Sequence, residues 1–174
     1  MTMPDEPPVR TVRPGVRVGV DVGSARVGVA ASDPTATFAH PVRTLARDEL
    51  HGTDLTQIAT LVEELAAVEV VVGLPLLLSG QEGEAARIAR DYAVALAARV
   101  GTVTVRLVDE RLTTVDAHRR LRDSGVPGRG QRKVVDQAAA VLILQTALDT
   151  EARSGRPPGE PVTTGGRRKK ERRR

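Results

Sequence analysis

Four acidic residues lie within or beside segments of this sequence that are otherwise apolar, and their side chains are the groups best able to do chemistry. They are Asp21, Asp109, Glu110 and Asp136. Burial of an unpaired carboxylate costs several kcal/mol, so each of these positions needs a reason. Asp21 is the hardest to explain structurally, because it lies inside the strand-like run V-R-V-G-V-D-V, where no helix start could use its charge.

A divalent cation is the simplest partner for such acids. Carboxylates held close together repel one another, so a site made of them is stable only when it is protonated or binds cations. Mg²⁺ prefers oxygen ligands and leaves positions for water and for substrate phosphate oxygens. Two such ions activate a water and stabilise the leaving oxygen in phosphodiester hydrolysis. The acids therefore predict a Mg²⁺ or Mn²⁺ site with nuclease chemistry.

Each acid also has a structural explanation when it is taken alone. A helix macrodipole would favour Asp136 at the start of its apolar segment. Asp109 or Glu110 could end a strand in solvent or pair with Arg111. The metal-site interpretation is favoured because Asp21 and the Asp109-Glu110 pair fall at the carboxyl ends of predicted strands, where α/β sheets bind ligands.

The elements that would position these acids follow from the apolar pattern. Strands are predicted at residues 16–22, 27–31, 38–45, 68–74 and 102–109, the third at an edge because it contains Pro41. Helices are predicted from Thr53 or Asp54 onward and at residues 84–99, 113–123 and 134–149. Residues 124–133 read as a Gly-rich, basic and mobile loop.

This order of elements predicts an α/β fold, a mixed sheet of about five strands with helices on both faces. One domain is expected over residues 16–150, between a disordered tail at 1–15 and a disordered basic tail at 151–174. The last 24 residues carry nine basic and three acidic side chains, whereas residues 1–150 carry 17 basic and 19 acidic ones. The tail is expected either to bind phosphates by counterion release or to act only as a solubilising end.

Composition excludes several classes of protein. The chain has no Cys, which rules out disulfides, thiolate catalysis and Cys-ligated zinc and favours the cytoplasm. Its only aromatic residues are Phe38 and Tyr92, which disfavours nucleic-acid binding by base stacking. No apolar run is long enough to span a membrane, so no membrane partner is expected.

Four blocks of the sequence, in this order, resemble the YqgF family, also called RuvX. They are G-V-D-V-G-S-A-R-V-G-V-A, V-V-V-G-L-P-L-L-L-S-G, V-D-E-R-L-T-T-V-D-A and K-V-V-D-Q-A-A-A-V-L-I-L-Q. The family was first regarded as Holliday-junction resolvases and is now described as nucleases that process pre-16S rRNA. The resemblance covers residues 16–149 and implies a ribonuclease H-like fold.

The resemblance also implies roles for individual residues. Asp21, Glu110 and Asp136 would be the catalytic, metal-binding acids, with Asp109 an adjacent acid of less certain role. Arg26 and Arg111 lie in the family's motifs and would bind substrate phosphates or pair with these acids. Because the body of the chain is net negative, local basic side chains are also expected to bind substrate. They are Arg119, Arg120, Arg122, Arg129, Arg132 and Lys133.

Other functions stay open at this point. The substrate is expected to be an RNA precursor at the ribosome, with a four-way DNA junction, which would suit a homodimer, as the alternative. The D-x-G-S turn is also similar to that of actin-like ATPases and sugar kinases, which need two such domains. A nucleic-acid-binding or ribosome-associated module without catalysis is the remaining alternative.

Overall fold

The computed structural model describes residues 12–112 and 129–164, and the side chains of residues 129–134 lie outside this description. It contains a six-stranded sheet in the order β3-β2-β1-β4-β5-β6. The strands are β1 (Arg17–Val22), β2 (Arg26–Ser32), β3 (Ala39–Ala46), β4 (Glu69–Leu74), β5 (Thr104–Asp109) and β6 (Glu160–Pro161). β1, β4 and β5 run parallel, and β2, β3 and β6 are antiparallel to their neighbours. The predicted α/β class and mixed sheet are confirmed.

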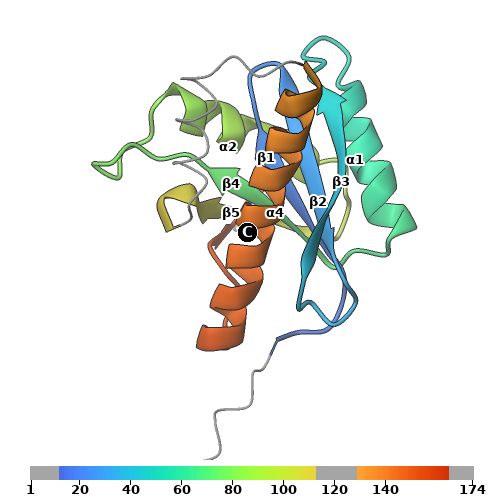
Figure 1. The fold of residues 1–174 in the computed structure, drawn as a ribbon, viewed down its shortest axis with the longest axis vertical. Helices are drawn as coiled ribbons and strands as arrows, with labels where there is room; N and C mark the ends of the chain where they lie inside the picture. The colour runs from blue at the N-terminus through green and yellow to red at the C-terminus, as the bar shows by residue number, and fades with distance from the viewer. Residues whose placement is uncertain (1–11, 113–128, 165–174) are drawn as a thin grey trace, which may run out of the picture.

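Helices cover both faces of the sheet (Figure 1). α4 (Arg129–Ser154) packs on one face, over β1, β2 and β3, while α1 (Thr53–Glu64) and α2 (Glu84–Ala97) lie on the other. Strand alternation separates two apolar clusters. Val18 and Val20 of β1 belong to the α1–α2 cluster, whereas Ala30 of β2 and Val71 of β4 belong to the α4 cluster.

Two helix starts differ from the predicted ones. α1 begins after Gly52, a left-handed residue that makes no side-chain cap, so neither Thr53 nor Asp54 is the cap. Asp48, in the preceding loop, acts at the helix start instead, because its carboxylate accepts hydrogen bonds from the backbone N–H groups of His51 and Thr53. α4 begins at Arg129, so residues 129–133 are helical rather than part of a loop.

Part of the predicted C-terminal tail is instead ordered in the fold. α4 continues to Ser154, and β6 then pairs with β5, bringing Glu160 opposite Leu107. Sequence patterning missed β6 because two residues carry no periodicity. Residues 151–164 therefore belong to the fold, whereas residues 165–174 and the predicted helix at 113–123 lie outside the described residues.

An ion network built on two buried glutamates joins the segment before β1 to the amino end of the sheet. Arg13 binds Glu151 of α4 at 2.6 Å and Glu69 of β4 at 3.1 Å. Arg17, only 1% exposed, lies 3.5 Å from Glu151, and Arg106 of β5 binds Glu69 at 2.7 Å. Residues 12–15, expected in a tail, are thus fastened to the domain by charge. None of the helices described here is both long and apolar enough to cross a membrane.

Candidate active site

Asp21 lies near the carboxyl end of β1, on the face that α4 covers. It is 2% exposed and pairs across the sheet with Gly28 of β2. Gly19, two residues earlier on the same face, lies so close to α4 that a Cβ there would stand 2.7 Å from Leu144 Cβ. Gly19 lets the helix approach, and Asp21 lies beyond that contact on the same face, as strand alternation requires.

Glu110 reaches the same place from β5. It is the first residue of a 3₁₀ turn, η1 (Glu110–Leu112), and is 3% exposed. A Cβ added to Gly73 would stand 2.4 Å from the Glu110 Oε1 atom. Gly73 follows Val72, and Val72 pairs with Val20, the residue before Asp21. The Glu110 carboxylate therefore rests on bare backbone beside the strand position of Asp21.

Asp136 comes to this edge from α4. It is 4% exposed, and its carbonyl oxygen lies over Gly28, the residue opposite Asp21. Because α4 begins at Arg129, Asp136 lies beyond the first helical turn, where the macrodipole is weak. The structural explanation by a helix start is therefore wrong for Asp136.

The structure separates Asp109 from Glu110. Asp109 pairs with Leu74, which packs in the cluster on the α1–α2 face. Its carboxylate binds Arg111 at 2.7 Å and accepts the Arg111 backbone N–H. The hydrogen bond from the Arg111 side chain lowers the pKa of Asp109, outweighing its partial burial. Asp109 and Arg111 form a pair of their own, and only Glu110 lies over Gly73.

Arg26 binds one of the three buried acids directly. Its Nε donates to Asp136 Oδ2 at 2.8 Å, and its side chain is 29% exposed. Arg26 begins β2, immediately after the turn that follows Asp21. The side chain is therefore only partly covered by protein. The sequence left open whether Arg26 binds phosphate or pairs with one of the acids, and the structure shows the ion pair with Asp136.

The remaining basic candidates are placed only in part. Arg129, Arg132 and Lys133 lie in the first turns of α4, before Asp136 and beyond the part of the helix that packs over Gly19 and Gly28. Their side chains fall outside the described atoms. Arg119, Arg120 and Arg122 fall in residues 113–128, also outside the description.

The donor chemistry of the site suits a hard divalent cation, since Asp21, Glu110 and Asp136 offer only carboxylate oxygens. Their burial, between 2% and 4% exposed, also favours a cation that would offset their charge. Within residues 12–112 and 129–164, no group of three or more His, Cys, Asp or Glu side chains is arranged to hold a metal ion. Arg26 instead supplies positive charge to Asp136.

Two polar residues beside the site were not identified from the sequence. Gln137, next to Asp136, donates from its Nε2 to Thr44 Oγ1 at 3.3 Å. Thr44 of β3 pairs with Gly28 of β2, which in turn pairs with Asp21. Gln137 could have been identified from the sequence, because it directly follows Asp136 in the V-V-D-Q block. Nothing in the sequence indicates that Thr44 lies near the site, because its position depends on the pairing of β3 with β2.

Comparisons with known proteins agree with this architecture. The family model RuvX, described as "Holliday junction resolvase", matches residues 15–150. A protein of Frankia casuarinae named "Putative pre-16S rRNA nuclease" is 59% identical over 82% of this chain and 70% of its own length. A protein of Kineococcus radiotolerans with the same name is 55% identical over 91% of this chain and 84% of its own length.

A solved structure shows the same fold. The structure described as "T. thermophilus RuvC in complex with Holliday junction substrate" superposes with a TM-score of 0.54 at 13% identity, covering 85% of this chain and 99% of that one. At this identity the similarity concerns the fold, which is ribonuclease H-like as predicted. On the family match and these identities, the chain belongs to the RuvX family, also known as YqgF.

Proposed function

We propose that this protein is a metal-dependent nuclease that hydrolyses phosphodiester bonds during 5′-end processing of pre-16S rRNA. The observation that carries the proposal is the burial of three carboxylates at one edge of the sheet. Glycines at the contacts allow the strands and the helix that carry these carboxylates to pack closely together. The names of the relatives support the rRNA substrate. Nucleic acid is the partner, and ribosomal association would follow from that substrate.

Asp21, Glu110 and Asp136 would hold Mg²⁺ or Mn²⁺ through their carboxylate oxygens. Bound there in a pair, such ions would supply an activated water and stabilise the leaving oxygen. Arg26 binds Asp136 and its side chain is partly exposed, so it suits contact with a phosphate oxygen beside the scissile bond. Arg129, Arg132 and Lys133 precede Asp136 in α4 and would bind the flanking backbone, with Arg111 as a further phosphate contact.

A four-way DNA junction is the second candidate substrate. It is favoured by the description of the matching family and by the Holliday junction that the RuvC structure holds. A junction has two-fold symmetry and would favour a homodimer that presents two sites, whereas a single RNA 5′ end needs only one.

The test is a cleavage assay on purified full-length protein with Mn²⁺. One reaction contains a pre-16S rRNA fragment that spans the mature 5′ end, and the other contains a four-way DNA junction. We expect cleavage of the RNA, and loss of that cleavage in Asp21→Asn and Glu110→Gln. Preferential cleavage of the junction would favour the second candidate, and cleavage of neither substrate would favour a non-catalytic binding protein.

A further inference from the structure

The turn that follows Asp21 is bound by Arg47, the residue directly after β3. The turn comprises Gly23, Ser24 and Ala25, and joins β1 to β2. The Arg47 backbone N–H donates to the Ala25 carbonyl at 2.9 Å, and its Nη1 donates to the Gly23 carbonyl at 3.0 Å. A single residue thus binds two of the three peptide groups of this turn.

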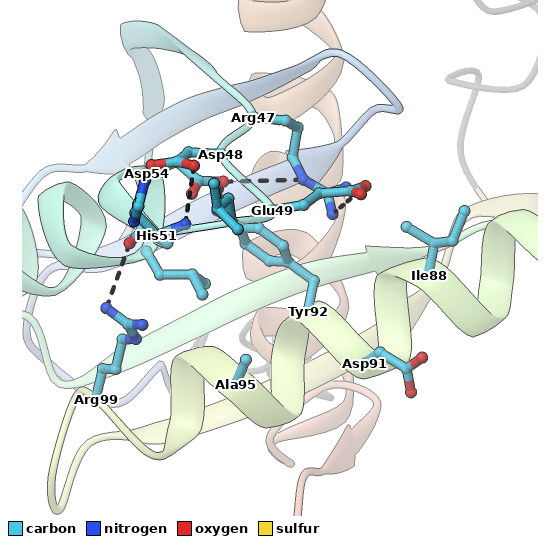
Figure 2. A pocket seen from close by; sticks show the side chains of 13 residues that line it. Arg47, Asp48, Glu49, His51, Asp54, Ile88, Asp91, Tyr92, Ala95 and Arg99 are labelled. Carbon is cyan, nitrogen blue, oxygen red and sulfur yellow. Dashed lines mark hydrogen bonds and ion pairs between the residues drawn. The ribbon is translucent and has the colours of Figure 1, made fainter.

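Arg47 is itself fixed by side chains from both helices on its face of the sheet. Its guanidinium lies over the ring of Tyr92 of α2, 5.1 Å from the ring centroid. Its Nε lies 3.9 Å from Asp54 Oδ2 of α1, and that same oxygen accepts a hydrogen bond from the Tyr92 hydroxyl at 3.0 Å. Figure 2 shows these side chains converging between the two helices.

Burial makes these contacts selective for arginine. Asp54 is 1% exposed, and its Oδ1 makes no hydrogen bond with any described group. The buried carboxylate is therefore stabilised through its other oxygen, Oδ2, by Tyr92 and Arg47. Burial, followed by the charge of Asp54 and its hydrogen bond, raises the pKa of Tyr92, which keeps its hydroxyl a donor. Only a planar guanidinium can stack on the ring, face Asp54 and still donate to Gly23.

Packing alone does not lock this region. A cavity of about 400 Å³ lies beside the cluster, lined by residues of the β3–α1 loop and of α2, including Arg47, Tyr92 and Arg99. Arg47 would have room to move if its polar contacts were lost. The contacts with Asp54 and Tyr92 therefore hold the Arg47 side chain where it reaches the turn, and they add to the hydrogen bond within the turn from the Gly23 N–H to the Arg26 carbonyl at 2.8 Å.

From this geometry we propose that Arg47 is a positioning residue for the nuclease site. Asp21 lies two residues before Gly23, and Arg26, which binds Asp136, directly follows Ala25. By fixing the two carbonyls between them, Arg47 sets where the Asp21 carboxylate and the Arg26 guanidinium lie relative to Asp136. The inference rests on the proposed function, but its structural part, control of the metal-binding acids, is measurable without catalysis.

The test compares wild type with Arg47→Gln and Arg47→Lys in two assays, carried out at a temperature where every variant is folded by circular dichroism. Mn²⁺ affinity is measured by isothermal titration, and RNA cleavage is measured at saturating Mn²⁺ to separate kcat from KM. For Arg47→Gln we expect weaker Mn²⁺ binding and a kcat about 10- to 100-fold lower with little change in KM, since small misplacements of catalytic groups have effects of this size. Arg47→Lys should recover only part of each loss.

The matched control is Arg99→Gln. Arg99 lines the same cavity and binds α1, through the Gly52 carbonyl and Thr56 Oγ1, but it does not contact the turn. The Arg99→Gln variant should be less stable than wild type, with no change in Mn²⁺ affinity or kcat. Wild-type values for Arg47→Gln in both assays, or equal losses in Arg99→Gln, would overturn the positioning role alone. A wild-type protein that neither binds Mn²⁺ nor cleaves would overturn the proposed function as well.

Discussion

The carbonyl oxygen of Asp136 lies directly over Gly28, so closely that a Cβ on Gly28 would stand 2.1 Å from that oxygen. Gly28 pairs with Asp21 across β1 and β2. The glycine therefore sets the height of α4 above the sheet beside Asp21, at the point where Asp136 lies on the helix. Because Gly28 has no side chain, α4 can pack at this height, and the position of Asp136 relative to the sheet depends on that packing.

Replacing Gly28 with Ala should force α4 away from the sheet, because the clash is with backbone atoms that cannot rotate aside. We expect a loss of about 3 kcal/mol in the free energy of unfolding, the upper part of the range for overpacked sites. Asp136 would move with the helix, so cleavage should fall by at least about tenfold. Urea denaturation and the RNA cleavage assay check the two effects.

Gly101→Ala is the matched control for this change. Gly101 has a φ of +65°, but a Cβ there would meet nothing within 4 Å. Only backbone strain of about 1 kcal/mol is expected, with cleavage unchanged. If Gly28→Ala were no more damaging than Gly101→Ala, α4 would not be held at this height by the glycine.

Asp21→Asn should remove metal-dependent cleavage while leaving the fold intact. The amide keeps the shape of the side chain but removes one of three negative charges buried at the same edge. We expect an unfolding midpoint in EDTA equal to or above that of wild type, and a much weaker Mn²⁺ isotherm. Equal Mn²⁺ binding by the variant and wild type would show that the metal, if any, binds elsewhere.

Arg26→Gln should make the protein more dependent on added metal. The substitution removes the 2.8 Å contact to Asp136 and leaves a buried carboxylate short of positive charge. In EDTA we expect a loss of about 2 kcal/mol in unfolding free energy, the scale of a charged hydrogen bond. Saturating Mn²⁺ should raise the melting temperature of the variant by more than that of wild type. An equal rise in both would argue against competition between Arg26 and the metal.

The ion network around Glu151 predicts an acid-sensitive contribution to stability. Burial disfavours the charged form of Glu151, but hydrogen bonds and charge from Arg13, with the charge of Arg17, outweigh it and lower the pKa below the ordinary 4.5. A lowered pKa stabilises the fold above the unfolded-state value, and this contribution is lost as pH falls through the folded-state value. Glu151→Gln should therefore cost about 3 kcal/mol at pH 7 and progressively less below pH 4.5.

The measurement is the unfolding free energy of both proteins from pH 7 to pH 3. The difference between them isolates Glu151 from the other titrating acids, which both proteins share. A difference that stays constant over this range would mean that Glu151 is not held charged by Arg13 and Arg17.

Deletion of residues 165–174 tests the basic tail. The segment G-G-R-R-K-K-E-R-R-R carries seven basic and one acidic side chain, net +6, whereas the whole chain is net +4. We expect weaker RNA binding and a smaller slope of log affinity against log salt concentration, because fewer counterions are released. Fluorescence anisotropy at several salt concentrations measures both quantities. An unchanged slope would show that the tail does not contact the substrate.

Much of this organisation was determined by the sequence itself. The apolar pattern placed Asp21 in one predicted strand and the Asp109-Glu110 pair at the end of another, and it predicted the strand at residues 68–74, because a buried strand tolerates few polar residues. The motif blocks identified the family. The four acids stood out because carboxylates are rare within apolar segments.

Tertiary structure decided the relationships that no local pattern encodes. It separated Glu110 from Asp109, since the strand pairing puts Asp109 beside Leu74 on the opposite face. It placed Arg47 against the turn after Asp21, a contact made between separate strands. It also joined Arg13 to Glu151, 138 positions apart. Periodicity reports which way a side chain faces on its own element, but only the packing of elements determines what it meets there.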